Sequence, residues 1–197
     1  MHKAYRFRIY PNKRQCELIH KTFGCCRFVF NHFLAKRKEV YETEGKTLGY
    51  NACSSLLTQL KKELEWLREP DATALQTELR YLDDAFKRFF REKKGYPRFK
   101  SRKNPVQSYT SKNNKGTIVI EGNRIRLPKL GWVKFAKSRE VEGRIISATV
   151  RRNASGKYFV SVLVETEIQP LPPAEGQVGV DLGVKDFAVL STGETIA

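Results

Sequence analysis

The chain has 197 residues, 40% of them hydrophobic, and carries 37 Lys and Arg against 21 Asp and Glu, a formal net charge of +16. This composition supports a folded core and excludes wholesale disorder, and no apolar run approaches the ~20 residues of a membrane span. We therefore expect a soluble cytoplasmic protein without a membrane partner. Nucleic acid is the commonest partner of so large a cationic excess, because each Lys or Arg near a phosphate releases condensed counterions.

The N-terminal segment "KAYRFRIYP" predicts a half-buried strand. Tyr5, Phe7 and Ile9 alternate with basic residues, which gives one apolar and one basic face. Asn12 then predicts a helix start, because Gln15 stands three residues on, as in a capping box. The helix is expected to reach about Tyr41, with an apolar stripe formed by Ile19, Phe23, Cys26, Phe30 and Phe33.

Two more helices are expected, and their apolar stripes predict one shared helical core. The second helix should cover about Tyr50 to Leu67, and the third should begin at Asp71 or Thr73 and continue past Phe89. A groove for a partner protein is the functional alternative for these stripes.

The segment "REKKGYPRFKSRK", residues 91–103, is basic and contains Gly, Pro and two aromatic residues, which predicts an extended loop. A solvated charge run is one interpretation. The interleaved aromatic rings favour contact with a sugar-phosphate backbone or a base. The predicted nucleic-acid-binding residues of this loop are Arg91, Lys93, Lys94, Tyr96, Arg98, Phe99, Lys100, Arg102 and Lys103.

Short alternating segments follow and predict two hairpins, with turns at "EGN" and "NASGK". Short strands with tight turns suggest a small barrel whose basic rim binds nucleic acid strands. The rim residues are Arg124, Arg126, Lys129, Lys134, Arg151 and Arg152. The first strand precedes the helices and the other strands follow them, so we expect the helical bundle to be inserted in the barrel. "QPLPPAEGQ" reads as a linker.

The cysteines and histidines do not predict a metal site. Cys16, Cys25, Cys26 and Cys53 form no C-x-x-C pair, so we expect buried, reduced thiols. His2, His20 and His32 read as surface or packing residues.

The segment "VGVDLGVKDFAVLSTGE", residues 178–194, predicts a strand, a bend and a strand with one carboxylate, Asp181, between Gly179 and Gly183. Glycines around a carboxylate leave room for a metal ion and a phosphate. Two-metal phosphoryl-transfer sites need several carboxylates, so on spacing alone Asp181 is more often a turn residue. Asp186 is interpreted as a turn or surface residue.

Six blocks occur together in order: "YRFRIYPNKRQCELI", "GCCRFVFNHFLAKR", "GYPRFKSR", "QSYTSKNN", "LPKLGWVKF" and "GVDLGVKDFAVLSTG". On these blocks the chain resembles the N-terminal half of TnpB, the transposon-encoded RNA-guided DNA endonuclease family related to type V CRISPR effectors. The resemblance implies an α+β chain. Its parts would be an oligonucleotide-binding-type wedge barrel at 1–10 and 95–170, a helical recognition domain at 11–94, a linker at 171–177, and the start of a RuvC nuclease domain of RNase H fold at 178–197.

The resemblance also implies roles for particular residues. Asp181 would be the first RuvC aspartate, a catalytic residue and a ligand of a Mg²⁺ site. The remaining residues of that site, and a separate zinc motif, would lie beyond Ala197. The DNA-motif readers would include Tyr50, Ser54, Gln76 and Thr110, whose side chains can bond to base edges. Ala72 replaces a frequent family lysine, which predicts a different motif. With so little of the nuclease fold present, residues 176–197 are expected to be poorly stabilised alone.

Three functions remain open at this stage. The first is the N-terminal part of an RNA-guided DNA endonuclease of the prokaryotic cytosol or nucleoid, with guide RNA and a DNA target carrying a short adjacent motif as partners. A C-terminal fragment acting in trans would be one way to complete it. The second is a naturally truncated, nuclease-dead nucleic-acid-binding protein that acts as a repressor or competitor. The third is a basic RNA-associated protein without guide or target.

Overall fold

The structure is a computed structural model that describes residues 1–167, 176–184 and 186–196. The chain divides into two compact units, Met1–Glu167 and Ile168–Ala197. The expected linker at 171–177 falls largely on residues outside the described ones. Among the described residues, no helix is long and apolar enough to cross a membrane.

The N-terminal strand and the capped helix are confirmed. In β1 (His2–Tyr10) the side chains of Tyr5, Phe7 and Ile9 are buried. Helix α1 (Lys13–Glu44) begins with the predicted capping box, because Asn12 Oδ1 accepts from the Gln15 backbone N–H at 2.9 Å and Gln15 Oε1 accepts from the Asn12 N–H at 3.0 Å. The helix runs one turn beyond the expected end, and Gly45 ends it at φ 66°, a left-handed conformation that suits glycine.

The second predicted helix is divided. Helix α2 (Tyr50–Glu63) ends at Leu64, which leaves the helical conformation, and a 3₁₀ turn, η1 (Glu65–Arg68), follows. The break turns Leu67 into the core, where it is fully buried. The free energy gained by burying this leucine therefore exceeds the free energy lost by ending the helix. Helix α3 (Ala72–Glu92) then begins where the sequence predicted.

The remaining strands of the first unit form one antiparallel sheet with β1. They are β2 (Gln107–Lys112), β3 (Val119–Glu121), β4 (Arg124–Leu127), β5 (Gly131–Phe135), β6 (Arg144–Arg152) and β7 (Tyr158–Glu165). The order is β2-β6-β7-β1-β5-β4-β3, and both predicted hairpins, β3–β4 and β6–β7, are present. Because β1 pairs with β5 and β7, the helices are inserted between a central strand and the rest of its sheet, as predicted.

The predicted closed barrel is not found. Within the described residues the sheet is open, with β2 and β3 as its edges. These edges are consecutive in sequence, and residues 113–118 connect them in a segment held in place by the Asn113 side chain. Asn113 Nδ2 donates to the Ile145 carbonyl at 3.0 Å and Asn113 Oδ1 accepts from the Ile118 N–H at 2.8 Å. In the part of the chain that the structure describes, the three-residue β3 pairs with β4 alone, so no ladder connects it to β2.

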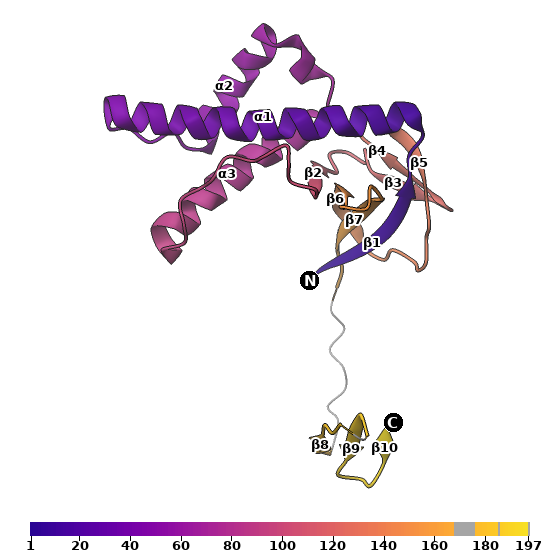
Figure 1. Cartoon of the computed structure of the whole chain (residues 1–197). Helices are drawn as coiled ribbons and strands as arrows, with labels where there is room; N and C mark the ends of the chain where they lie inside the picture. Colours follow the sequence, from indigo (N-terminus) through magenta and orange to yellow (C-terminus); the bar gives the residue numbers. More distant parts are fainter. Residues whose placement is uncertain (168–175, 185, 197) are drawn as a thin grey trace. The chain divides into compact units, whose positions relative to one another are not determined.

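Helix α1 belongs to both parts of this unit (Figure 1). The first half lies against the sheet, where the Phe23 ring meets Tyr109 of β2 with a centroid distance of 5.8 Å. The second half lies along α2 and α3, and Phe33 is buried there. All five residues of the predicted stripe are buried, so one core joins helices and sheet.

The second unit holds a small antiparallel sheet in the order β10-β9-β8, formed by β8 (Val180–Asp181), β9 (Ala188–Leu190) and β10 (Thr195–Ile196). Ala188 is buried, whereas Leu182 and Phe187 are each 70% exposed. This sheet therefore has little core of its own, as expected from the sequence.

Candidate nucleic-acid interface and the Asp181 strand

A row of basic and aromatic side chains crosses the outer face of the large sheet. Strand pairing sets Ser108 of β2 beside Arg151 of β6, Arg151 beside Phe159 of β7, and Phe159 beside Arg8 of β1. Paired residues point to the same side of a sheet, so these four side chains share one face. That face is opposite to the buried side chains of β1.

Stacking between rings and guanidinium groups organises this row. The Arg6 guanidinium lies over the Phe159 ring at 4.5 Å, and Arg8 lies 5.9 Å from Phe159 and 5.4 Å from Tyr10. Arg8 Nε is buried and has no hydrogen-bond partner within the described residues. The cations are thus held in place by rings, while their charges are free of acidic partners in the part of the chain that the structure describes.

A second row continues the surface toward the far edge. Tyr10 pairs with Lys134 of β5, Lys134 pairs with Arg124 of β4, and both basic residues are exposed. Arg126, also predicted, donates to the Gly116 carbonyl at 2.8 Å. We call the two rows together the basic sheet face; it consists of Arg6, Arg8, Tyr10, Arg124, Arg126, Lys134, Arg151 and Phe159. Lys129 lies outside it, in an exposed turn at φ 65°.

Sequence reasoning proposed Arg151 and Arg152 together, but strand geometry separates them. Arg152 pairs with Tyr158, on the opposite side of the sheet, where the Tyr158 hydroxyl and His20 Nε2 of α1 are 2.8 Å apart. Sequence reasoning also left Arg6, Arg8, Tyr10 and Phe159 out of its binding set. The alternation in β1 indicated a basic face, but only the pairing register brings Phe159 opposite Arg8 and within contact of both arginines.

The loop was predicted at residues 91–103, but α3 ends at Glu92, so Arg91 belongs to the helix and the loop begins at Lys93. Lys94 pairs with Glu92 at 2.7 Å, and the Tyr96 ring packs edge-on against Phe86 and Phe89. Arg98, Phe99, Arg102 and Lys103 are exposed, as are Arg91 and Lys93. The loop therefore offers a set of exposed cations with Phe99, which is 61% exposed, beside them.

Lys100 has a structural role within this loop. The ammonium pairs with the carboxylate of Glu78, which is buried in α3, and lies 4.5 Å from the Phe30 ring. The Lys100 backbone is held on both sides by Asn31, which accepts from its N–H at 2.7 Å and donates to its carbonyl at 3.0 Å. Lys100 thus fixes the loop against α1 and α3.

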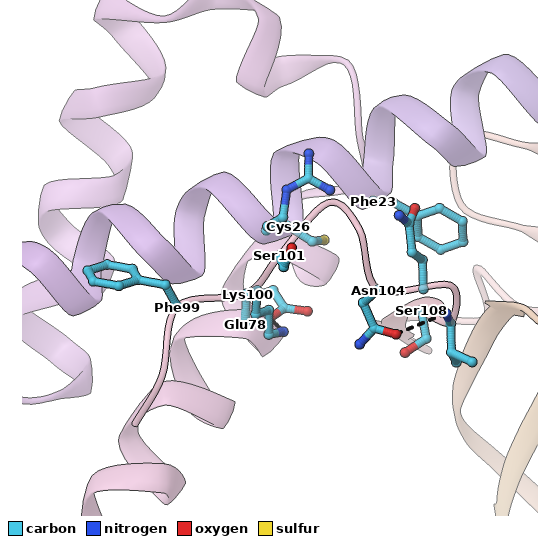
Figure 2. Close-up of a pocket in the computed structure, with 11 residues that line it drawn as sticks. Phe23, Cys26, Glu78, Phe99, Lys100, Ser101, Asn104 and Ser108 are labelled. Atoms are coloured by element: carbon cyan, nitrogen blue, oxygen red, sulfur yellow. Dashed lines mark hydrogen bonds and ion pairs between the residues drawn. The ribbon is translucent and has the colours of Figure 1, made fainter. Parts of the chain in front are cut away.

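The fixed loop forms one wall of a pocket of about 460 Å³ between α1 and the start of β2 (Figure 2). Arg27, Ser101, Asn104, Gln107 and Ser108 contribute polar groups to its lining, and Phe99 stands at one end. Such a mixture of amides, hydroxyls and one guanidinium suits a polar ligand with several donors and acceptors.

The four predicted motif readers lie in different surroundings. Tyr50 begins α2, and the Arg80 guanidinium covers its ring at 4.4 Å. Ser54 is half-buried in α2, and Gln76 is exposed on α3. Thr110 is only 9% exposed, and its hydroxyl accepts from the Tyr81 hydroxyl at 3.0 Å and lies 2.8 Å from that of Thr149.

The cysteines agree with the prediction of reduced thiols. All four are free, and Cys25, Cys26 and Cys53 are buried while Cys16 is half-buried. Burial raises the pKa of Cys25 to about 11 and also raises the pKa of Cys26 and Cys53. These thiols are neutral at physiological pH and act as small apolar groups.

Asp181 lies in β8 of the second unit, opposite Val189, and its side chain is exposed. The Gly179 N–H donates to Ser191 Oγ at 2.8 Å. A side chain at Gly183 would come 3.1 Å from the Asp186 carbonyl, so this glycine allows a close backbone approach. Asp186 lies in the bend before β9. Over the described ranges no three His, Cys, Asp or Glu residues gather around a cation site. A single carboxylate such as that of Asp181 does not by itself make a complete Mg²⁺ site.

The fold and the basic sheet face define a class: mixed helix and antiparallel-sheet proteins with a cationic, aromatic surface of the kind that binds nucleic acid. A family model described as a helix-turn-helix domain, of the OrfB IS605 type, matches residues 1–46. In the structure these residues form β1 and the uninterrupted helix α1, so the described range contains one helix and no turn between two.

Comparison with curated proteins identifies relatives along most of the chain. The chain is 37% identical over 196 residues to "Putative RNA-guided DNA endonuclease InsQ" of Escherichia coli K12, which covers 97% of the chain and 48% of that protein. It is 33% identical over 199 residues to "Putative RNA-guided DNA endonuclease" of Streptomyces pristinaespiralis, 98% of the chain and 49% of that protein. It is also 33% identical over 111 residues to "Virulence protein VsdF" of Salmonella dublin, 51% of the chain and 93% of that protein. The chain belongs to the TnpB (OrfB) family and spans about half the length of the two endonuclease relatives.

One solved structure titled "Cryo-EM structure of the Cas12f1-sgRNA-target DNA complex" aligns with 100% of this chain and 57% of its own at 14% identity and a TM-score of 0.47.

Proposed function

We propose that this chain is the nucleic-acid-binding part of an RNA-guided DNA endonuclease, with guide RNA and a DNA target as its ligands. The observation that carries the proposal is 37% identity along 97% of the chain to a relative named for that activity. The basic sheet face supports it, because its cations and rings are arranged to meet phosphates and bases.

The two surfaces of the first unit suggest a division of labour. The basic sheet face presents arginines stacked on rings and suits an irregular RNA strand, since stacked guanidinium groups contact both phosphates and bases. The loop and its pocket present amides and hydroxyls, which suit hydrogen bonds to base edges beside a short DNA motif. The motif readers Gln76 and Ser54 fit this second role.

Asp181 takes the role of a RuvC metal ligand in this proposal. An exposed carboxylate flanked by glycines can approach a metal ion and a phosphate. In any form of the protein that cuts DNA, Asp181→Ala should abolish cleavage and leave binding intact. Cleavage that survives this change would refute the role, and binding without cleavage in every form would favour the alternative, a binding protein that represses or competes.

Binding itself is tested by titrating the chain against structured RNA and duplex DNA at increasing salt. The proposal expects log K to fall linearly with log salt, with a slope of roughly −0.7 to −0.9 per phosphate contacted. A variant with Arg6, Arg8 and Arg151 changed to Gln should lose RNA affinity. A control in which Lys61 and Lys62 of α2 are changed to Gln should bind RNA normally. Equal losses of RNA affinity in both variants would show that binding depends on net charge alone and not on the basic sheet face.

A further inference from the structure

The ends of α1 and α3 enclose a second pocket, of about 350 Å³, that differs in character from the loop pocket. Its lining includes Tyr41, Leu48, Phe86, Phe89, Phe90 and Tyr96, so five of these six side chains are aromatic. Phe90 is 67% exposed and Tyr41 59%. Exposed aromatic side chains gathered in one place mark a binding surface more often than chance.

Packing holds the rings in fixed orientations. Tyr96 meets Phe86 at 5.5 Å and Phe89 at 5.4 Å, in both cases edge to face. Phe86 and Phe90 are near-parallel, with an interplanar angle of 22°. Arg37 lies 4.5 Å above Phe86 and is itself held by Asp83 at 3.0 Å. The pocket is preformed, so a planar ligand would meet ring faces without reordering them.

The charges beside the pocket select among planar ligands. Arg91 follows Phe90 directly and Lys93 stands three residues after it; both are exposed. Within the lining itself, Lys38 pairs with the acidic Glu42 at 3.7 Å and Arg37 pairs with Asp83. The acidic neighbour Glu92 is paired with Lys94. An apolar protein segment would gain nothing from the exposed Arg91 and Lys93, whereas a nucleotide would place its base on the rings and its phosphate on these cations.

We propose that this aromatic pocket binds one unpaired base of a single-stranded nucleic acid, with the adjoining phosphate on Arg91 and Lys93. The inference rests on the proposed nucleic-acid-binding function and adds a base-binding pocket at the start of the basic loop that shares no lining residue with the loop pocket. RNA and DNA share the chemistry that the pocket recognises, so both strands belong in the test.

The experiment measures affinity of the full chain for a fluorescent oligouridylate of about 12 nucleotides and for its DNA counterpart. Base stacking contributes enough that Phe90→Ala should weaken binding roughly 5- to 100-fold. Phe90→Leu keeps apolar area but has no aromatic face for stacking, so it should recover little of the affinity lost in Phe90→Ala. Trp66→Leu, which removes an exposed ring elsewhere, is the matched control and should bind normally. A weakening with one strand only would identify that strand as the ligand.

Cross-linking of the unaltered chain keeps the test independent of variant folding. An RNA with 4-thiouridine should cross-link within residues 86–96. If the chain binds neither strand at low salt, the proposed function fails. If it binds but Phe90→Ala binds equally well, or Phe90→Leu fully restores affinity, or the cross-links avoid 86–96, only the pocket is wrong. A dimer that Phe90→Ala dissociates, with strand affinity unchanged, would also overturn the assignment and make this surface a self-association interface.

Discussion

Replacing Lys100 with Met should destabilise the first unit far more than replacing its partner Glu78 with Gln. Glu78 is 1% exposed, and Lys100 is its only ionic partner in the described residues. Removing one partner of a buried pair costs about 3–5 kcal/mol. Because the Lys100 side chain is 40% exposed and the pair is only partly shielded, we expect about 2–3 kcal/mol for Lys100→Met. Glu78→Gln leaves an ammonium that reaches water and should cost about 1 kcal/mol or less.

The pH dependence follows from the pKa of Glu78. Burial raises that pKa above the ordinary value of 4.5, and the nearby Lys100 partly offsets the shift. In Lys100→Met the offset is gone and the folded-state pKa rises further. An acid whose pKa is raised by folding stabilises the fold below its unfolded pKa and loses that contribution as the pH rises through the folded value. The cost of Lys100→Met should therefore be small near pH 4.5 and grow by up to about 1.4 kcal/mol per pH unit until it levels.

Urea unfolding followed by circular dichroism at about pH 5 and about pH 8 measures both effects. The double variant Glu78→Gln with Lys100→Met is the control, since it has no buried charge and should show no added pH dependence. An equal cost for Lys100→Met at the two pH values, or a larger cost for Glu78→Gln, would refute the view that Lys100 neutralises a buried carboxylate.

Three further changes test other parts of the molecule. Asn12→Ala removes the capping bond at the start of α1 and should lower the free energy of unfolding by about 1 kcal/mol, measured in urea; no loss would mean that Gln15 alone suffices. Thr110→Val removes the hydroxyl that accepts a hydrogen bond from Tyr81 and should lower the free energy of unfolding by about 1–2 kcal/mol, measured by heat or urea. If stability is unchanged while duplex DNA binding falls, the Thr110 hydroxyl contacts DNA instead. Arg151→Gln should reduce the slope of log K against log salt for RNA by about 0.7–0.9, and an unchanged slope would remove Arg151 from the interface.

The local elements could be predicted from the sequence because their signals are local. Alternation in β1 fixed its buried face, and the Asn12 to Gln15 spacing fixed the start of α1. The break at Leu64 could not be predicted, because it depends on the burial of Leu67 against elements distant in sequence. The open sheet escaped prediction for a similar reason: strand patterns indicate pairing but not whether the two edges meet.

The candidate interface was predicted in part. Charge and aromatic content pointed to the loop, but composition counted Lys100 as a binding residue although its ammonium neutralises Glu78. Composition also could not reveal that Phe159 lies near both Arg6 and Arg8, because that depends on the register between β1 and β7. For Asp181, the flanking glycines and the family resemblance together predicted a metal ligand, and this role stays a prediction.

The central position of β1 has a consequence for how the protein is made. The ribosome completes this strand first, yet its partners are β5 (Gly131–Phe135) and β7 (Tyr158–Glu165), which emerge after all the helices. Both edges of β1, with the apolar Tyr5, Phe7 and Ile9, stay unpaired throughout that interval. Helix α1, which follows directly and shares the same core, is the first element able to cover the apolar side chains of β1, whereas the edges of the strand wait for β5 and β7.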